Sequence, residues 1–205
     1  MCLVIFKGVD ILNIEVIKEN ALKNHVPILL DDTLEVITNI LKEIKPRKIL
    51  EIGTAVGYSA ICFEKYVEEK IDTIERDEDR FEEATKNVKA LNLENKINLI
   101  KGDAIEILET FESKKEYDFV FIDAAKSKCK IFLEHALRLG TDNVTIVVDN
   151  VLYKGYVMSD YNNHKHRTAV RNLREFLKYI EENENLDSKI LEVGDGLAII
   201  EKLRN

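Results

Sequence analysis

The stretch ILEIGTAVGYSAI, residues 49–61, predicts more about the fold than any other part of the chain. A short β-prone run leads into Gly53 and Gly57, and a segment with helical spacing begins near Ser59. A strand, a glycine turn and a helix in this order are typical of a parallel α/β sheet, where glycines let the backbone approach a ligand. Free N–H groups at the helix start favour an anionic group. The stretch therefore predicts a nucleotide-type binding site beyond the end of the strand.

The rest of the chain repeats this alternation of short apolar runs and helical segments. We predict further strands at residues 71–74, 97–100, 119–122 and 144–148, and helices at residues 58–69, 78–91, 104–110 and 126–139. Two helices are expected before the first strand, and one after a polar loop at residues 153–166. A turn at residues 194–196 separates two final apolar runs, as in a β-hairpin. The pattern predicts one α/β domain, residues 1–205, with a mostly parallel sheet, helices on both faces and a C-terminal antiparallel hairpin.

Composition limits the class of protein. A chain of 205 residues that is 45% hydrophobic can bury one substantial core. A net charge of −8 leaves no overall basic footprint, so nucleic-acid contact requires a local basic patch. The cysteines, Cys2, Cys62 and Cys129, lack the paired spacing of zinc sites or disulfide frameworks. No apolar stretch approaches bilayer length, so we expect a soluble, cytoplasmic protein with no membrane partner.

An acidic residue ends the second predicted strand. Glu75 follows Gly53 by roughly 20 residues, where an acid accepts hydrogen bonds from the ribose hydroxyls of a nucleotide. The first turn reads G-x-x-x-G with Glu51 before it, whereas dinucleotide dehydrogenases have G-x-G-x-x-G, and this difference favours S-adenosylmethionine. After the third strand, Ala104 is expected beside the adenine. A dehydrogenase of the same architecture and an ordinary βα turn with two glycines are the alternatives.

Polar residues also end the fourth and fifth predicted strands. Asp123 follows the fourth, within FIDAAK, and Asp149 and Asn150 end the fifth. Two carboxylates and an amide oxygen at neighbouring strand ends suit Mg²⁺, and a bound cation offsets the cost of burying a carboxylate. Each residue also has an ordinary interpretation. Asp123 is a candidate helix N-cap, Asp149 with Asn150 a candidate Asx turn, and Lys126 a candidate solvated lysine.

Together these residues resemble a known family. From about His25 to the C-terminus, the chain resembles the cation-dependent, S-adenosylmethionine-dependent O-methyltransferases of the catechol O-methyltransferase-like group. The resemblance assigns to the cofactor Val26, Ile28, Glu51, Gly53, Ser59, Glu75, Ala104 and Asp123. It assigns Asp123, Asp149 and Asn150 to the metal, and Lys126 with Asp123 to catalysis.

Within the group, segments such as HVPI, TIER and DNVLYKG look most like the bacterial tRNA 5-hydroxyuridine methyltransferases. Two departures stand out. Ala124 and Ala125 replace the aromatic residues that follow the first metal-binding Asp in catechol enzymes, which weakens the catechol assignment. GTDN, residues 140–143, replaces the usual Gly-Gly turn before the fifth strand.

The resemblance implies a class I methyltransferase fold, Rossmann-like, in which N-terminal helices at about residues 10–44 cover the cofactor site. It implies that Mg²⁺ or Mn²⁺ holds two adjacent substrate oxygens while Lys126 takes the proton of the attacking hydroxyl. The expected reaction methylates the 5-hydroxyl of 5-hydroxyuridine in tRNA to give 5-methoxyuridine. A small catechol is the alternative substrate, and a homodimer is expected.

A basic segment at residues 164–174 favours tRNA. Its basic side chains include Lys165, Arg167, Arg171 and Arg174. The three arginines are spaced to share one helical face, and phosphate binding by an acidic protein needs such a patch. The alternative is a solvated face whose arginines pair with Glu175, Glu181 or Glu182.

A catalytically dead relative would be expected to have lost the base or a metal ligand, and this chain keeps them.

Overall fold

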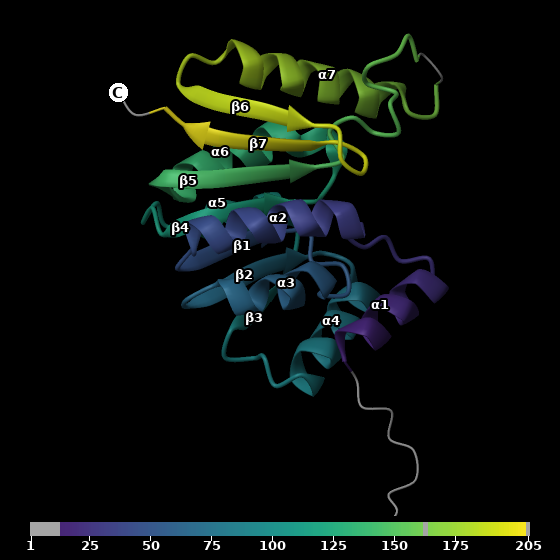
Figure 1. Cartoon of the computed structure of the whole chain (residues 1–205), viewed down its shortest axis with the longest axis vertical. Coiled ribbons are helices and arrows are strands. Elements are labelled where there is room, and N and C mark those ends of the chain that lie inside the picture. The colour runs from purple at the N-terminus through teal and green to yellow at the C-terminus, as the bar shows by residue number, and fades with distance from the viewer. Residues whose placement is uncertain (1–12, 162–163, 204–205) are drawn as a thin grey trace, which may run out of the picture.

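A computed structural model describes residues 13–161 and 164–203 of the chain. Within these residues the chain forms a seven-stranded sheet with the order β3-β2-β1-β4-β5-β7-β6 (Figure 1). Its strands are β1 (Lys48–Ile52), β2 (Lys70–Glu75), β3 (Ile97–Lys101), β4 (Tyr117–Ile122), β5 (Gly140–Asp149), β6 (Leu186–Leu191) and β7 (Leu197–Lys202). The first five strands are parallel, and β7 runs antiparallel to both β5 and β6. The predicted parallel sheet and C-terminal hairpin are confirmed.

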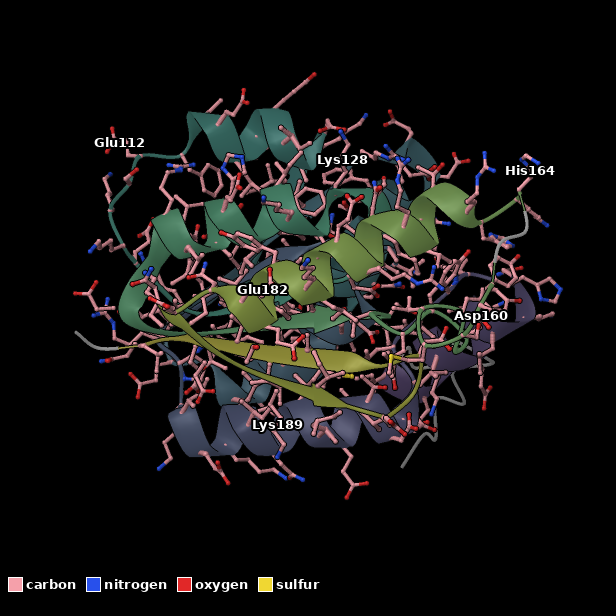
Figure 2. All side chains as sticks on the ribbon, turned by 90° about the horizontal axis from the view of Figure 1, so that it is seen from above. Glu112, Lys128, Asp160, His164, Glu182 and Lys189 are labelled. Atoms are coloured by element: carbon pink, nitrogen blue, oxygen red, sulfur yellow. The ribbon has the colours of Figure 1, made fainter. Side chains whose placement is uncertain are left out.

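Helices cover both faces of the sheet. They are α1 (Ile14–Lys23), α2 (Asp31–Ile44), α3 (Tyr58–Phe63), α4 (Glu78–Ala90), α5 (Ala104–Thr110), α6 (Cys129–Leu139) and α7 (Arg167–Glu182). The helices α5, α6 and α7 bury their apolar side chains in one core cluster, and α1 to α4 in a second cluster. Figure 2 shows α6 and α7 on one side of the sheet and α2 on the other. Among the described helices, none is long and apolar enough to cross a membrane.

The two clusters follow from the alternation of side chains along the strands. In β4, Val120 and Ile122 point to the cluster with α5 to α7, whereas Phe119 and Phe121 point to the opposite cluster. Successive side chains of a strand lie on opposite faces, so a strand covered on both sides reads as one apolar run. This is why the central strands could be recognised in the sequence.

Three elements differ from the predicted bounds. The helix expected at residues 58–69 ends at Phe63 and continues as a 3-10 turn (Glu64–Tyr66), because buried Val67 is extended and leads the chain into β2. Residues 126–128 form another 3-10 turn before α6. The GTDN segment belongs to β5 rather than to a turn, and the β4–β5 register is irregular between Tyr117 and Phe119.

The sheet order places several strand ends beside one another. Strands β1 and β4 are neighbours although β2 and β3 separate them in sequence, so the direction of strand addition reverses between them. Ligands of open α/β sheets bind beyond the carboxyl ends of strands at such a point. The first two helices are joined to each other by an ion pair, in which Lys18 Nζ of α1 lies 2.5 Å from Asp31 Oδ1 of α2, and both residues face the strand ends. Residues 10–12 of the predicted N-terminal cover lie outside the described residues.

Candidate active site

The turn after β1 requires glycine at its first position. Gly53 has a φ of 103°, and a Cβ atom there would lie 2.1 Å from the backbone oxygen of Asp123. Any side chain at residue 53 would therefore push the ends of β1 and β4 apart. Gly57, with a φ of 84°, is the N-cap of α3. Gly53 thus brings the backbone of the first turn close to that of Asp123 at the point where the strand order reverses, whereas Gly57 packs against Ala84 of α4.

Glu51 is fully buried behind this turn. Ser59 Oγ donates to Glu51 Oε1 at 2.5 Å, and the Thr73 hydroxyl donates to Glu51 Oε2. Burial raises the pKa of Glu51 to about 7, although both hydroxyls favour the charged form. Within the described chain, Glu51 and Ser59 do not line the cavity at the strand ends. The structure gives them a role in bracing the turn, and their direct contact with the cofactor stays a prediction.

Glu75 ends β2 with its side chain toward the cavity. Its carboxylate accepts backbone N–H bonds from Ala55 at 2.8 Å, Arg76 at 3.0 Å and Asp77 at 2.9 Å. These bonds fix the carboxylate at the edge of the turn. Each oxygen of an ionised carboxylate has two lone pairs, so acceptor capacity remains for a ligand's hydroxyl groups.

We expect Glu75→Ala to weaken S-adenosylmethionine binding by at least about tenfold, because the hydrogen bonds of two ribose hydroxyls to a charged acceptor are lost. Isothermal titration calorimetry measures this directly. The control is Glu78→Ala, because Glu78 is an exposed residue that pairs with Lys101. Equal affinity of the Glu75 variant and the parent, with both proteins folded, would remove Glu75 from the cofactor site.

A cavity of about 880 Å³ opens at these strand ends. The predicted site residues that line it are Val26, Ile28, Gly53, Glu75, Ala104, Asp123, Lys126, Asp149 and Asn150. A cavity of this size accommodates a cofactor with a second small molecule or one nucleotide. The structure therefore brings together residues that lie more than a hundred positions apart in the sequence.

Asp123, Asp149 and Asn150 form the polar wall of this cavity. The Asn150 amide Nδ2 donates to Asp123 Oδ1 at 3.1 Å, and the Asn150 backbone N–H donates to Asp149 Oδ1 at 2.7 Å. Burial raises the pKa of Asp123. Burial and the adjacent Asp123 together raise the pKa of Asp149 to about 7. Ionising either of these carboxyl groups therefore takes more free energy than it would in water.

Helix capping does not account for Asp123 in this wall. Neither the 3-10 turn at residues 126–128 nor α6 has a side-chain cap, so Asp123 is not an N-cap. The donor set of two carboxylate groups and one amide oxygen is chemically suited to Mg²⁺ or Mn²⁺. Among the described residues, no cluster of three or more His, Cys, Asp or Glu side chains has metal-binding geometry, so a cation here depends on Asn150 and on water or substrate.

Lys126 follows Asp123 by three residues and begins the 3-10 turn at residues 126–128. It is partly buried, it lines the cavity, and its charge favours the ionised form of Asp123 and so opposes the rise in the Asp123 pKa. Its ammonium lies over the ring of Tyr153, with Nζ 5.1 Å from the ring centroid. Lys126 is thus not the freely solvated lysine of the alternative interpretation.

Arg174 is engaged within the protein. Its Nε donates to the Val157 carbonyl at 2.9 Å, and Nη2 donates to the Tyr156 carbonyl at 3.2 Å. A third bond reaches the carbonyl of Ser159. The guanidinium group thereby holds the loop between β5 and α7, and this contact would compete with phosphate binding.

The other basic residues of the segment are exposed at the start of α7. Lys165 and Arg167 are exposed, and Arg171 Nε lies 3.8 Å from Glu175 Oε1. The pairing of Arg171 with Glu175 therefore matches the alternative interpretation, in which this is a solvated helix face with arginines paired to glutamates. Surface pairs of this kind contribute little and can exchange partners, so phosphate binding by Arg167 and Arg171 stays a prediction.

Two residues of the site were missed by the sequence interpretation. Asp195 lines the cavity, and its negative charge contributes to the raised pKa of Asp149. The sequence showed it only as the centre of a hairpin turn. Tyr153 was noted as the start of a polar loop, and its contact with Lys126 crosses 27 positions of sequence, which no local pattern reports.

The chain matches the O-methyltransferase family over residues 12–203. The chain belongs to this family, and it is an S-adenosylmethionine-dependent O-methyltransferase of the caffeoyl-CoA and catechol type. The dehydrogenase alternative is excluded by this finding.

Similar proteins come from distant organisms. A catechol O-methyltransferase of Niastella koreensis is 32% identical over 75% of this chain and 72% of its own length. The tapetum-specific methyltransferase 1 of Arabidopsis thaliana is 30% identical over 82% and 74%. A Staphylococcus aureus structure, assigned by name to the caffeoyl-CoA O-methyltransferases, has 33% identity and a TM-score of 0.86, and the match covers 96% of this chain and 93% of that one.

Proposed function

We propose that this protein is a divalent-metal-dependent methyltransferase that acts on one of two adjacent substrate oxygens, and that its substrate is 5-hydroxyuridine in tRNA. The observation that supports this most is the wall formed by Asp123, Asp149 and Asn150 beside Lys126 in the same cavity as Glu75. The 5-hydroxyl and the C4 carbonyl of 5-hydroxyuridine are adjacent oxygens, as are the two hydroxyls of a catechol.

The residues of the cavity divide the work of the reaction. A divalent cation held by Asp123, Asp149 and Asn150 would supply positive charge that polarises the two substrate oxygens. Glu75, fixed by its bond from Ala55 of the first turn, holds the ribose of the cofactor. Lys126 accepts the proton of the attacking hydroxyl. Because the base, the hydroxyl and the methyl group are held in fixed positions, the hydroxyl oxygen is aligned for in-line attack on the methyl carbon.

The tRNA substrate is supported by the exposed basic side chains at the start of α7 and by the sequence resemblance to tRNA 5-hydroxyuridine methyltransferases. Ala124 and Ala125 line the cavity where bulkier side chains would narrow it. A target base must leave its stack to reach a catalytic pocket, and phosphate contacts outside the pocket position it. On the same resemblance we propose a homodimer, which sedimentation analysis would test.

A small catechol is the second candidate. Phe132 of α6 is buried and lines the cavity, so the wall is not without an aromatic ring even though residues 124 and 125 are alanine. Relatives are named catechol and caffeoyl-CoA O-methyltransferases. The two candidate substrates differ in what they place outside the cavity, because only RNA brings phosphate groups to the protein surface.

We expect the double variant Arg167→Ala, Arg171→Ala to raise the apparent KM for tRNA carrying 5-hydroxyuridine by about tenfold, with little change in cofactor affinity. Two lost phosphate contacts should also make the logarithm of affinity depend less steeply on salt, by a slope of about 1.4 to 1.8. Steady-state kinetics at several salt concentrations, beside kinetics on a free catechol, measure both. Arg174 is left intact because it holds the loop.

The matched control is the double variant Lys178→Ala, Lys189→Ala, which removes the same charge elsewhere. Lys178 pairs with Glu182 on α7 as Arg171 pairs with Glu175, with a separation of 3.6 Å. Its kinetics on tRNA should equal those of the parent. If catechols are methylated efficiently and both double variants have the same kinetics on tRNA, the substrate is a small molecule rather than tRNA.

A further inference from the structure

Behind Lys126 lies an aromatic ring that the chemistry described so far does not use. Lys126 lines the cavity, whereas Tyr153 lies outside the lining formed by the described chain. Nζ of Lys126 is 5.1 Å from the centroid of the Tyr153 ring. Within residues 13–161 and 164–203, Nζ of Lys126 has no hydrogen bond and no ion pair, and it faces the Tyr153 ring.

Tyr153 is itself held in place from several sides. Its hydroxyl lies 2.9 Å from His166 Nδ1, and its ring meets the rings of Tyr156 and His166 edge to face at 5.7 Å and 5.5 Å. Its backbone N–H donates to the Asp195 carbonyl at 3.1 Å, and its φ is 44°. A ring fixed at its backbone, its edge and its hydroxyl is a rigid support for a flexible lysine side chain.

We propose that Tyr153 is a positioning residue that holds Lys126 toward the substrate hydroxyl and stabilises the positive charge that forms on Nζ. The inference rests on the proposed function, because it takes Lys126 as the base. As the hydroxyl O–H bond breaks, an N–H bond forms on Lys126. The oxygen's electron pair bonds the methyl carbon, and the carbon–sulfur bond breaks with its pair remaining on sulfur.

The ring contact becomes stronger during this step. A neutral amine gains little from an aromatic face, whereas an ammonium is attracted by the ring quadrupole. An interaction that is stronger in the transition state than in the ground state raises kcat rather than lowering KM. Tyr153 should therefore affect kcat more than KM, and this should hold for any substrate with the same pair of oxygens.

The test compares rings with a side chain that has none. Tyr153→Leu should lower kcat by about 5- to 30-fold, the range expected from loss of a partly desolvated cation–π contact. The KM and the cofactor dissociation constant should stay within about twofold. Tyr153→Phe and Tyr153→Trp keep a π face, so their kcat should stay within about threefold of the parent even though Phe lacks the hydroxyl that bonds His166 Nδ1.

A pair of the same kind elsewhere provides the control. Lys130 Nζ lies 4.3 Å from the ring centroid of Tyr179, and neither residue lines the cavity formed by the described chain. Tyr179→Leu removes this pair and should leave kcat unchanged. Equal losses in the Leu variants at residues 153 and 179 would reduce the effect to general destabilisation and overturn the inference.

A spectroscopic measurement tests the contact without turnover. Methyl groups placed on lysines by reductive methylation with ¹³C-formaldehyde give resonances, and Lys126→Arg assigns that of Lys126. Ring current should shift this resonance upfield in the parent and in the Phe and Trp variants, and the shift should vanish in Tyr153→Leu. An unshifted resonance in the parent would overturn the inference.

The kinetics are measured on both tRNA carrying 5-hydroxyuridine and a free catechol. If the parent methylates only catechol, the tRNA proposal fails, and the inference about Tyr153 is then decided on catechol. If Tyr153→Leu keeps the kcat of the parent on the substrate that is methylated, the inference fails whichever substrate that is.

Discussion

Replacing Asp149 by alanine is expected to lower methyl transfer by about 100-fold or more, because the proposed cation at this wall would contribute several kcal/mol of transition-state stabilisation. Asp149 supplies one of the two carboxylates, and it lies at the end of β5 beside Asn150. Chelation of the parent by EDTA should have the same effect. Added Mg²⁺ or Mn²⁺ should restore the chelated parent but not the variant, as a radiolabelled methyl-transfer assay would show.

The control variant lies on the same strand. Asp142 is exposed, pairs with Lys115 at 2.8 Å and lies far from the carboxyl end of β5. Asp142→Ala should therefore retain the activity of the parent and its response to EDTA. Full activity of the chelated parent would show that methyl transfer at this wall needs no cation.

Replacing Lys126 by methionine is expected to lower kcat by about 100- to 10,000-fold, the usual contribution of a positioned general base. Methionine keeps much of the apolar stem but cannot accept a proton. Cofactor affinity should stay within about twofold, because Glu75 and the turn after β1 are unchanged. Single-turnover kinetics separate the chemical step from product release and therefore measure the effect on proton transfer and methylation.

Lys130→Met is the matched control for this variant. Lys130 is exposed on α6 one helical turn from Lys126, and its ammonium contacts Tyr179 rather than the cavity. It should turn over as fast as the parent. A Lys126 variant whose single-turnover rate stays within about threefold of the parent would show that another group, or water, takes the proton.

Much of this site was predictable because its residues follow apolar strands in the sequence. Asp123, Asp149 and Glu75 each end a strand that reads as a buried run, and parallel strands bring their carboxyl ends to one edge. The glycines were equally readable, since Gly53 has a positive φ and no space for a side chain. Local sequence therefore predicted both the fold and the wall of the cavity.

The remaining features depend on contacts between distant segments. The contact of Glu51 with the cofactor stays a prediction, and the sequence did not show that Thr73 of the neighbouring strand and Ser59 bond its carboxylate behind the turn. Arg174 was grouped with its helical neighbours, but the loop before α7 folds back and presents carbonyl groups to it. A sequence pattern gives the face of a helix on which a side chain lies, but it does not give the segment that packs there.

Manganese binding followed by electron paramagnetic resonance would reveal the proposed metal site itself, because it detects the cation rather than its effect on rate. The titration is carried out on the parent, Asp149→Ala and Asp142→Ala in the presence of S-adenosylhomocysteine. We expect a saturable Mn²⁺ site in the parent and in Asp142→Ala, and its loss in Asp149→Ala. Absence of binding in the parent, or equal binding in all three proteins, would contradict a metal site formed by Asp123, Asp149 and Asn150.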